Sequence, residues 1–419
     1  MPAPTFPTTP RPEELARPVV QAYERAVDEL LINIARNFNV NDADLGTQAW
    51  RFRQLAKLGQ LTRENIKIIA KATGQNEALI TEALTRAAII ALDDVEPSLR
   101  EAARLGLLSP PAESGGLAYA TPRMQGVLDD FNRQAVDKLN LVNTTMLQSS
   151  LDAYTQGISN IVMNAERMAF AQGELNLATA KTLLGTEARH TAVRTAIKRM
   201  TDAGITGFYD RAGRKWSAEA YVNMDVGTTM HNAYIQAAAT RNEDYGNDLV
   251  YAGIKRVSRP LCYPWQGKVL SMNNRSGVVL DLNDNPLQVY PISQTTYGEP
   301  AGLWGINCGH SYNVFIAGLS IIRGEVPDKD ENDALYALTQ EQRRLEREVR
   351  YAKRDAAIAD ATGDKEAFDA AALRVKQKQA NLNAFLKEND LNASVYRTQV
   401  VGYNRSVSAK ATAATRAST

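Results

Sequence analysis

The sequence predicts an α+β protein that is predominantly α-helical, with a helical N-terminal half, a small domain with a mixed or antiparallel sheet, and a C-terminal helical hairpin. Apolar residues recur at spacings of three and four between residues 13 and 203, which is the pattern of amphipathic helices. Short segments rich in β-branched and aromatic residues follow residue 204, and Asn, Gly and Pro separate them. Helical periodicity then returns near residue 339. A chain of 419 residues is long enough for roughly two to four domains.

The N-terminal half is expected to contain an arm, two groups of helices and a linker. Residues 1–12 are rich in Pro and Thr, which predicts a flexible or docking arm. Residues 13–106 carry the helical spacing and predict an N-terminal helical region. Residues 107–122 are rich in Pro, Gly and Ser and predict a linker. Residues 123–203 predict long helices with a break near Gly157.

Residues 204–325 are expected to form a small α+β domain. A β-hairpin is predicted at its start, with the turn at Asp210–Gly213. A helix around residues 217–242 separates this hairpin from further strand-like segments, which read LVYAGIKRVS, KVLS, VVLDL and LQVYP. Because these segments are short and interrupted by Asn, Gly and Pro, they predict a small mixed or antiparallel sheet.

The C-terminal part is expected to form a helical hairpin at residues 326–390, followed by a tail. The sequence TQEQ, in which Thr339 and Gln342 form a potential capping box, marks the expected start of the helical pattern. Residues 391–419 carry four basic and no acidic side chains and are rich in Ser, Thr and Ala. This composition predicts a basic mobile tail.

Composition excludes several classes of protein. The formal net charge is +1, from 48 basic and 47 acidic residues, whereas a protein that coats nucleic acid through one broad face is usually far more basic. No apolar run reaches the ~18 residues that a membrane helix needs. The N-terminus lacks the charged start and apolar run of a secretory signal, and two cysteines make no disulfide framework. We therefore expect synthesis and folding in a cytosol.

Two segments, residues 256–271 and 295–318, have the most unusual composition and hold both cysteines. Cys262, Cys308 and His310 offer the thiolate and imidazole groups that zinc prefers. However, no CxxC pair accompanies them and no fourth ligand is visible. A contact between two buried cysteines, or a simple packed thiol, is the favoured alternative. A spacing of two residues also argues against Cys308 and His310 as nucleophile and base.

Motifs of common catalytic sites are missing from the sequence. There is no GxGxxG after a strand-like segment, no GxxxxGK[ST] and no HExxH. The other histidines, His190 and His231, lie in helical segments, where a surface or capping role is the default. We therefore expect no enzymatic activity, no cofactor and no small-molecule substrate.

The two unusual segments carry a motif of many uncommon residues in a fixed order. Its residues are Arg259, Cys262, Trp265, Gly267, Tyr297, Gly298, Trp304, Gly305, Asn307, Cys308, Gly309 and His310. With this motif the chain resembles the phage minor capsid protein family, which is related to the Mu F-like head morphogenesis proteins. The resemblance covers residues 185–355 and departs at Gly227, where the family pattern leads us to expect an arginine.

The resemblance implies a structural minor capsid protein of a tailed-phage head that acts in head assembly, at the portal or the inner capsid surface. It implies the portal protein and the major capsid protein as partners, the virion as the location, and synthesis in the bacterial host cytoplasm. The motif residues then have a structural role. One alternative is an ADP-ribosyltransferase-like enzyme or effector, because the family fold looks distantly like that of those enzymes. A second is a DNA-contacting packaging or ejection factor that uses residues 391–419.

Overall fold

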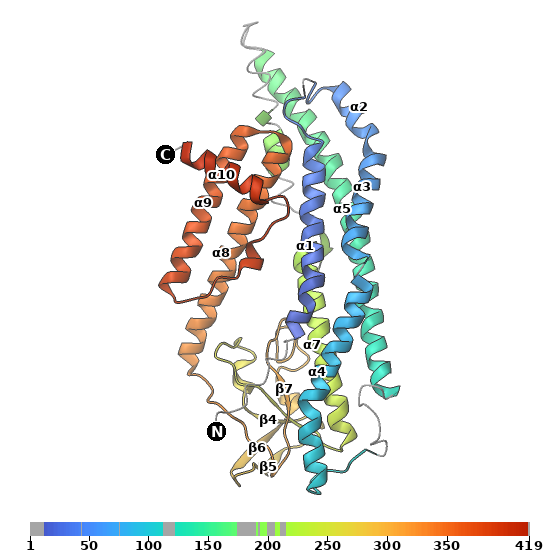
Figure 1. The fold of residues 1–419 in the computed structure, drawn as a ribbon, viewed down its shortest axis with the longest axis vertical. Coiled ribbons are helices and arrows are strands. Elements are labelled where there is room, and N and C mark those ends of the chain that lie inside the picture. Colours follow the sequence, from blue (N-terminus) through green and yellow to red (C-terminus); the bar gives the residue numbers. More distant parts are fainter. Residues whose placement is uncertain are drawn as a thin grey trace. The chain divides into compact units, whose positions relative to one another are not determined.

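The computed structural model confirms a predominantly helical α+β fold (Figure 1). The structure describes residues 12–42, 44–74, 76–111, 122–173, 190–191, 193–198, 206–209 and 215–417. The predicted arm, apart from Pro12 at the start of α1, and most of the predicted linker lie outside these ranges. The helices are α1 (Pro12–Arg36), α2 (Gln48–Ala56), α3 (Leu58–Thr73), α4 (Asn76–Arg104), α5 (Pro122–Gly173), α7 (Ala218–Asp244), α8 (Lys329–Thr362), α9 (Lys365–Glu388) and α10 (Arg405–Ala417).

Contacts divide the chain into two compact units, and each is built from segments that are distant in sequence. Unit 1 comprises residues 1–20, 76–139 and 222–337, and unit 2 comprises residues 21–75, 140–221 and 338–419. This division differs from the consecutive domains expected from the sequence. The reason is that α1, α5, α7 and α8 each contribute residues to both units. Composition along the chain carries no sign of such a division.

Unit 1 contains a mixed five-stranded sheet in the order β5-β6-β4-β3-β7. Its strands are β3 (Leu249–Ala252), β4 (Val269–Ser271), β5 (Gly277–Leu280), β6 (Pro286–Pro291) and β7 (Tyr312–Val314), with 3-10 turns at Tyr263–Trp265 and Ile292–Gln294. Strands β4 and β6 are parallel, and the other neighbours are antiparallel. Figure 1 shows α4 and α7 beside this sheet. The sheet was expected to be mixed or antiparallel, and it is mixed.

The alternating direction of the side chains along β3 explains how both faces of the sheet are buried. Val250 and Ala252 belong to the large core that also contains residues of α4 and α7. Leu249 lies on the opposite face in a smaller cluster with Val289 and Phe315. Successive side chains of a strand point to opposite faces, so a strand of four apolar residues serves two cores. Both cysteines belong to the large core.

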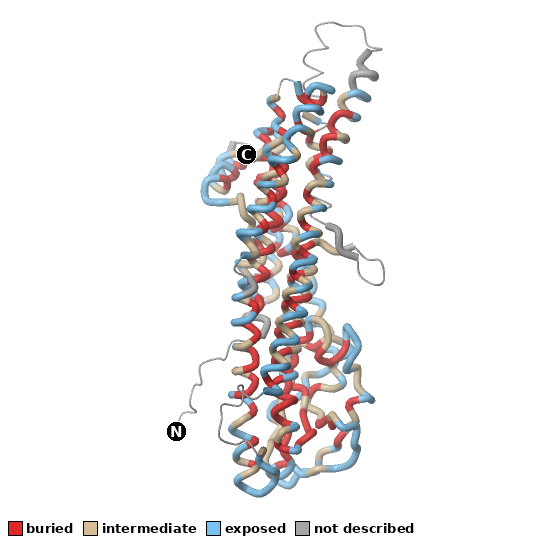
Figure 2. The backbone as a smooth tube through the Cα atoms, turned by 90° about the vertical axis from the view of Figure 1, so that its right-hand side faces the viewer, coloured by how far each residue is buried: buried red, intermediate tan, exposed pale blue. Residues whose placement is uncertain are grey.

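Unit 2 is helical apart from a short hairpin. Strands β1 (Thr206–Tyr209) and β2 (Lys215–Ser217) pair antiparallel, as predicted, while the predicted turn lies outside the described residues. Residues 193–198 are helical. Helices α8 and α9 form the predicted C-terminal hairpin, and buried positions recur along one side of each helix (Figure 2). No helix among the described residues is long and apolar enough to cross a membrane.

Helix α5 continues through Gly157, where the sequence predicted a break. A Cβ atom at this position would lie 2.8 Å from the ring of Phe38. That ring also stacks on Tyr154 at 5.3 Å between centroids. Glycine therefore serves to admit an aromatic ring against the helix backbone, and this packing outweighs the weak helix propensity of glycine.

Helix α8 begins ten residues before the predicted capping box. Thr339 therefore lies inside the helix, and the N-terminal hydrogen bonds come from Asp328. One carboxylate oxygen of Asp328 accepts from the backbone N–H groups of Asp330, at 2.8 Å, and Glu331, at 3.3 Å. Aspartate is a good capping residue, so the helix begins after Asp328 and not at the predicted capping box.

The C-terminal segment is not a mobile tail in the structure, because residues 405–417 form α10. Val407 and Ala411 are buried in a cluster with apolar residues of α8 and α9. Lys410 pairs with Asp360 of α8 at 2.8 Å, and Arg397 pairs with Glu346 at 3.1 Å. The composition of this segment did not reveal the apolar stripe of α10, because the stripe is only two turns long.

Candidate functional site

The motif residues of the second segment lie in a tight loop between residues 295 and 311 that precedes β7. Two of its glycines are there because a side chain would collide with the backbone. A Cβ atom at Gly302 would lie 1.9 Å from the carbonyl oxygen of Thr296, and one at Gly305 would lie 2.4 Å from that of Glu299. Side chains at these two positions would therefore obstruct the loop.

Two larger residues of the same loop adopt the left-handed backbone conformation. Trp304 has φ +56° and Asn307 has φ +54°. Asparagine visits this region readily, whereas tryptophan rarely does. Burial compensates at Trp304, because its ring is 3% exposed and packs 5.0 Å from the ring of Tyr312. The loop is thus held by core packing together with successive turn hydrogen bonds, such as those from the Gly302 N–H to the Glu299 carbonyl at 3.0 Å and from the Gly305 N–H to the Gly302 carbonyl at 3.1 Å.

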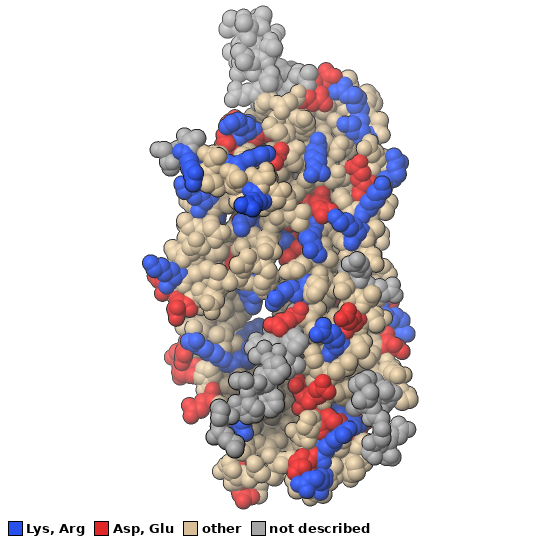
Figure 3. All heavy atoms as spheres, in the orientation of Figure 1, with Lys and Arg blue, Asp and Glu red and all other residues tan. Residues whose placement is uncertain are grey.

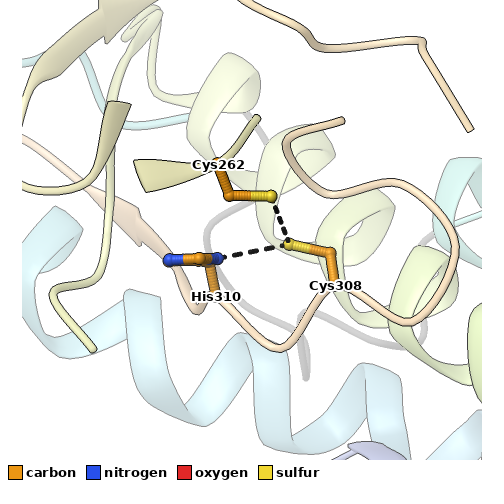
Figure 4. Close-up of side chains that lie close together, drawn as sticks. All are labelled: Cys262, Cys308 and His310. Carbon is orange, nitrogen blue, oxygen red and sulfur yellow. Dashed lines mark hydrogen bonds between the residues drawn. The ribbon is translucent and has the colours of Figure 1, made fainter. Parts of the chain in front are cut away.

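Cys262, Cys308 and His310 converge inside the core of unit 1 (Figure 4). The two Sγ atoms are 3.9 Å apart, and both thiols are free. The Sγ atom of Cys308 lies 3.4 Å from Nδ1 of His310. The three residues are 0%, 6% and 3% exposed, respectively. The predicted contact between buried cysteines is therefore present, and the imidazole joins it.

Cys308 and His310 meet in spite of the spacing that argued against it. Residues 308–311 are not helical and lead directly into β7. In an extended chain residues i and i+2 point to the same side, so both groups face the core while Gly309 faces away from it. The sequence argument assumed that neighbouring positions diverge, and this assumption fails for extended backbone.

A second layer of polar residues holds the imidazole, and sequence reasoning missed it. The Nε2 atom of His310 lies 3.0 Å from the hydroxyl oxygen of Ser258, which is itself buried. Asn332 fixes the backbone of Ser258 from both sides, since its Oδ1 accepts from the Ser258 N–H at 2.6 Å and its Nδ2 donates to the Ser258 carbonyl at 3.0 Å. Asn332 is 74 residues from Ser258, so no local pattern links them.

Arg259 connects the two motif segments. Its guanidinium donates to the carbonyl of Ile306 at 2.7 Å and to the carbonyl of Gly302 at 3.3 Å. The same group lies 3.8 Å from Sγ of Cys262. This arginine therefore satisfies buried carbonyls of the loop and places a positive charge beside a thiol.

The two thiols are not equivalent. The hydrogen bond with Cys262, supported by the neighbouring imidazole of His310, lowers the pKa of Cys308. The same hydrogen bond raises the pKa of Cys262, and burial adds to the increase. Cys308 is thus the thiol that ionises first.

The remaining motif residues surround this cluster. Trp265 is half-buried and meets Tyr290 edge-on at 6.2 Å between ring centroids, whereas the ring of Tyr297 is largely exposed and covers Trp304. Of the two motif tryptophans, Trp304 is therefore fully buried and Trp265 only partly. Gly267, Gly298 and Gly309 lie in the loops, with φ +70° at Gly267 and +89° at Gly298.

A second buried polar cluster, in unit 2, escaped the sequence analysis. It joins Glu24 and Asp28 of α1, Glu219 of α7, and Arg350 and Arg354 of α8. Arg354 contacts Asp28 at 2.8 Å and Glu219 at 2.7 Å, and Arg350 pairs with Glu24 and with Glu219 at 3.2 Å. The sequence shows only ordinary helix-surface charges at these positions. We refer to this set as the buried ion network.

Opposing effects set the pKa values in the buried ion network. Burial raises the pKa of Asp28, and the guanidinium of Arg354 offsets only part of the increase. Burial acts in the same direction on Glu219, but the charges of Arg354 and Arg350 outweigh it and lower the pKa of that carboxyl. The difference arises because Glu219 contacts both arginines.

Comparison with known proteins gives two kinds of match. The sequence profile of the family described as phage minor capsid protein 2 matches residues 9–387. A structural protein of Lactococcus phage LL-H is 26% identical over 355 residues, which cover 83% of this chain and 87% of that protein. A structural protein of Lactococcus phage mv4 is 30% identical over 100 residues, which cover 24% of this chain and 81% of that protein. No solved structure matches the chain.

Proposed function

Because the chain belongs to the phage minor capsid protein 2 family, we propose that it is a structural protein of the virion head that joins the portal protein to the major capsid protein during head assembly. The observation that carries the proposal is the extent of the family match, which includes most of both units. The relative from phage LL-H, also named a structural protein, aligns over a similar extent. A structural role in a phage capsid follows for the whole chain and not for one module.

The location of the polar motif residues supports a structural role. Cys308 and His310 have the residue types of a nucleophile and a base, but they are 6% and 3% exposed and are covered by the core of unit 1. A macromolecular substrate cannot reach a thiol in such a position, whereas a thiol that packs and hydrogen-bonds there stabilises the loop. The motif therefore acts on the fold of unit 1.

The distribution of charge favours contacts with protein over a broad contact with DNA. Positive and negative side chains are interspersed over the face in Figure 3. Two of the four basic residues beyond residue 390, Arg397 and Lys410, are already paired with carboxylates of α8. Such pairing reduces the number of phosphates that the segment can neutralise.

Quantitative mass spectrometry of purified phage particles tests the proposal. We expect the chain at a small, constant ratio to the portal protein and far below the major capsid protein. Absence from particles that contain the portal protein would overturn the virion assignment. The major tail protein from the same particles calibrates recovery.

Cross-linking within intact particles tests the proposed partners. Lysine-reactive cross-links are expected to connect this chain with the portal protein and the major capsid protein. Cross-links to tail components alone would refute the head location. Particles cross-linked after dissociation provide the matched control, because specific contacts are lost there while random ones persist.

A further inference from the structure

We propose that Cys262, Cys308 and His310 bind one zinc ion through their two Sγ atoms and the Nδ1 atom of the imidazole. The fourth position is taken by a small oxygen donor, either the carbonyl of Gly302 or a water molecule. This goes beyond the proposed capsid function, which does not require a metal. The site would tie together the two motif segments of unit 1.

Two of the distances among the donor atoms match a tetrahedral zinc centre. With Zn–S bonds of about 2.3 Å and Zn–N bonds of about 2.05 Å, two sulfurs are separated by about 3.8 Å and a sulfur and a nitrogen by about 3.6 Å. The observed separations are 3.9 Å between the sulfurs and 3.4 Å between Sγ of Cys308 and Nδ1 of His310. All three donor atoms lie within 4.8 Å of one another.

The surroundings of His310 are those of a metal-binding histidine. Such a histidine almost always donates its second ring N–H to an oxygen, which fixes the tautomer and orients the lone pair. Here Nε2 lies 3.0 Å from the hydroxyl of Ser258, which leaves Nδ1 directed at Cys308. Asn332 in turn clamps the backbone of Ser258. A packed thiol does not need such an arrangement around its neighbour.

The charges also balance within the core. Two thiolates and one neutral imidazole carry a total charge of −2, so a Zn²⁺ ion makes the centre neutral, which burial favours. The carbonyl oxygen of Gly302 lies 3.4 Å from Sγ of Cys262. For a Zn–O bond of about 2.1 Å, a tetrahedral centre requires about 3.6 Å between sulfur and oxygen. Among the described residues, no other Cys, His, Asp or Glu joins this cluster.

The location of the cluster explains what a metal would contribute. Cys262 and Cys308 are 46 residues apart, and Cys308 and His310 lie on a loop without regular structure. A metal that binds only the folded arrangement adds its binding free energy to folding. The ion would therefore hold the loop of residues 295–311 against the 3-10 turn that follows Cys262.

The metal content of the full chain tests the proposal. The chain is expressed without a polyhistidine tag, purified with reductant, and analysed by inductively coupled plasma mass spectrometry. We expect one zinc per chain, and removal by a strong chelator should lower the melting temperature until zinc is restored. Cobalt in place of zinc should give thiolate-to-metal charge-transfer absorption. A reduced, folded chain that neither retains zinc nor shows this absorption overturns the proposal.

Variants assign the ligands. Cys308→Ser and His310→Gln should abolish retention of zinc, while the matched control His231→Gln should retain one ion per chain. Ser258→Ala should weaken zinc affinity by roughly 10–100-fold without changing the stoichiometry at saturation. The cobalt spectrum is recorded on the wild-type chain, so the zinc proposal can be tested even if a variant fails to fold. Full zinc retention by folded Cys308→Ser would refute the assignment.

Discussion

Replacing Arg354 with methionine is expected to destabilise unit 2 strongly. The guanidinium is 4% exposed and its two partners, Asp28 and Glu219, are 3% and 10% exposed. Methionine preserves much of the apolar stem and removes the charge. Asp28 then keeps only the backbone N–H of Val401 as a direct partner, at 3.0 Å, and Glu219 keeps Arg350.

The magnitude follows from the cost of a buried carboxylate without its counter-charge. Removal of one partner from a buried ion pair costs about 3–5 kcal/mol. For a cooperative unit of roughly 150–250 residues, each kcal/mol lowers the melting temperature by about 2–4 °C, so the expected decrease is about 6–20 °C. The loss of stability should exceed the loss caused by replacing any exposed arginine of α8 with methionine.

The decrease in melting temperature should also depend on pH and should become smaller as the pH falls. Loss of Arg354 raises the folded-state pKa of both Asp28 and Glu219, because the attraction that favoured their charged forms is gone. At a given pH the folded variant therefore binds more protons than the folded wild type. As the pH falls through these raised pKa values, the variant loses less stability than the wild type. The difference in free energy of unfolding between the two proteins therefore becomes smaller on acidification.

Thermal unfolding followed by circular dichroism, at neutral pH and at about pH 5, provides the measurement. Arg344→Met is the matched control, since Arg344 lies on α8 and pairs with Glu341 and Glu348 at the surface. The control should unfold near the wild-type temperature. Equal melting temperatures for Arg354→Met and the control would show that the buried ion network is not desolvated and would refute the reasoning.

Three further predictions concern two tryptophans, two glycines and Glu96. Trp304→Ala should cost about 3–5 kcal/mol in chemical denaturation and Trp265→Ala clearly less, because only the first ring is fully buried; equal losses would contradict this. Gly227→Ala should stabilise the protein by about 0.5–1 kcal/mol, since a Cβ there meets nothing within 4 Å, whereas Gly302→Ala should lower the melting temperature because its Cβ would lie 1.9 Å from a carbonyl oxygen. The carboxyl of Glu96 is partly buried, which raises its pKa, yet hydrogen bonds from Arg241 and Arg100 outweigh this effect and hold the pKa at about 2. Its contribution to stability is therefore present at neutral pH and is lost between about pH 5 and about pH 2, and Glu96→Gln should flatten that part of the pH profile.

The sequence predicts those parts of the fold that depend on the local periodicity of apolar residues. The short apolar run of β3 and the helical stripes of α8 and α9 depend on residues within a few positions of one another. Element type and the overall class are therefore accessible without a structure. The β1–β2 hairpin was accessible for the same reason, because turn residues separate two short segments that contain aromatic residues.

The features that the sequence does not predict depend on partners far away in the chain. Gly157 looks like a helix breaker until the ring of Phe38 is placed against it. The buried ion network joins residues separated by up to 326 positions, and each of its charges looks like a solvated helix surface on its own. Local patterns carry no information on which exposed-looking charges will be buried, because burial is decided by tertiary packing.

The Cys/His cluster lies between these two cases. Its residue types are visible in the sequence, and Cys308 and His310 converge because burial alternates over residues 308–311, which lead into β7. In a helix, residues i and i+2 diverge around the axis, whereas in extended backbone they share a face. A Cys-Gly-His sequence just before a strand is therefore evidence for a joint site, and the missing fourth side-chain ligand argues only against a closed four-side-chain centre. The third donor, Cys262, comes from a 3-10 turn that Arg259 fastens to the same loop, so the geometry depends on that arginine as much as on the ligands themselves.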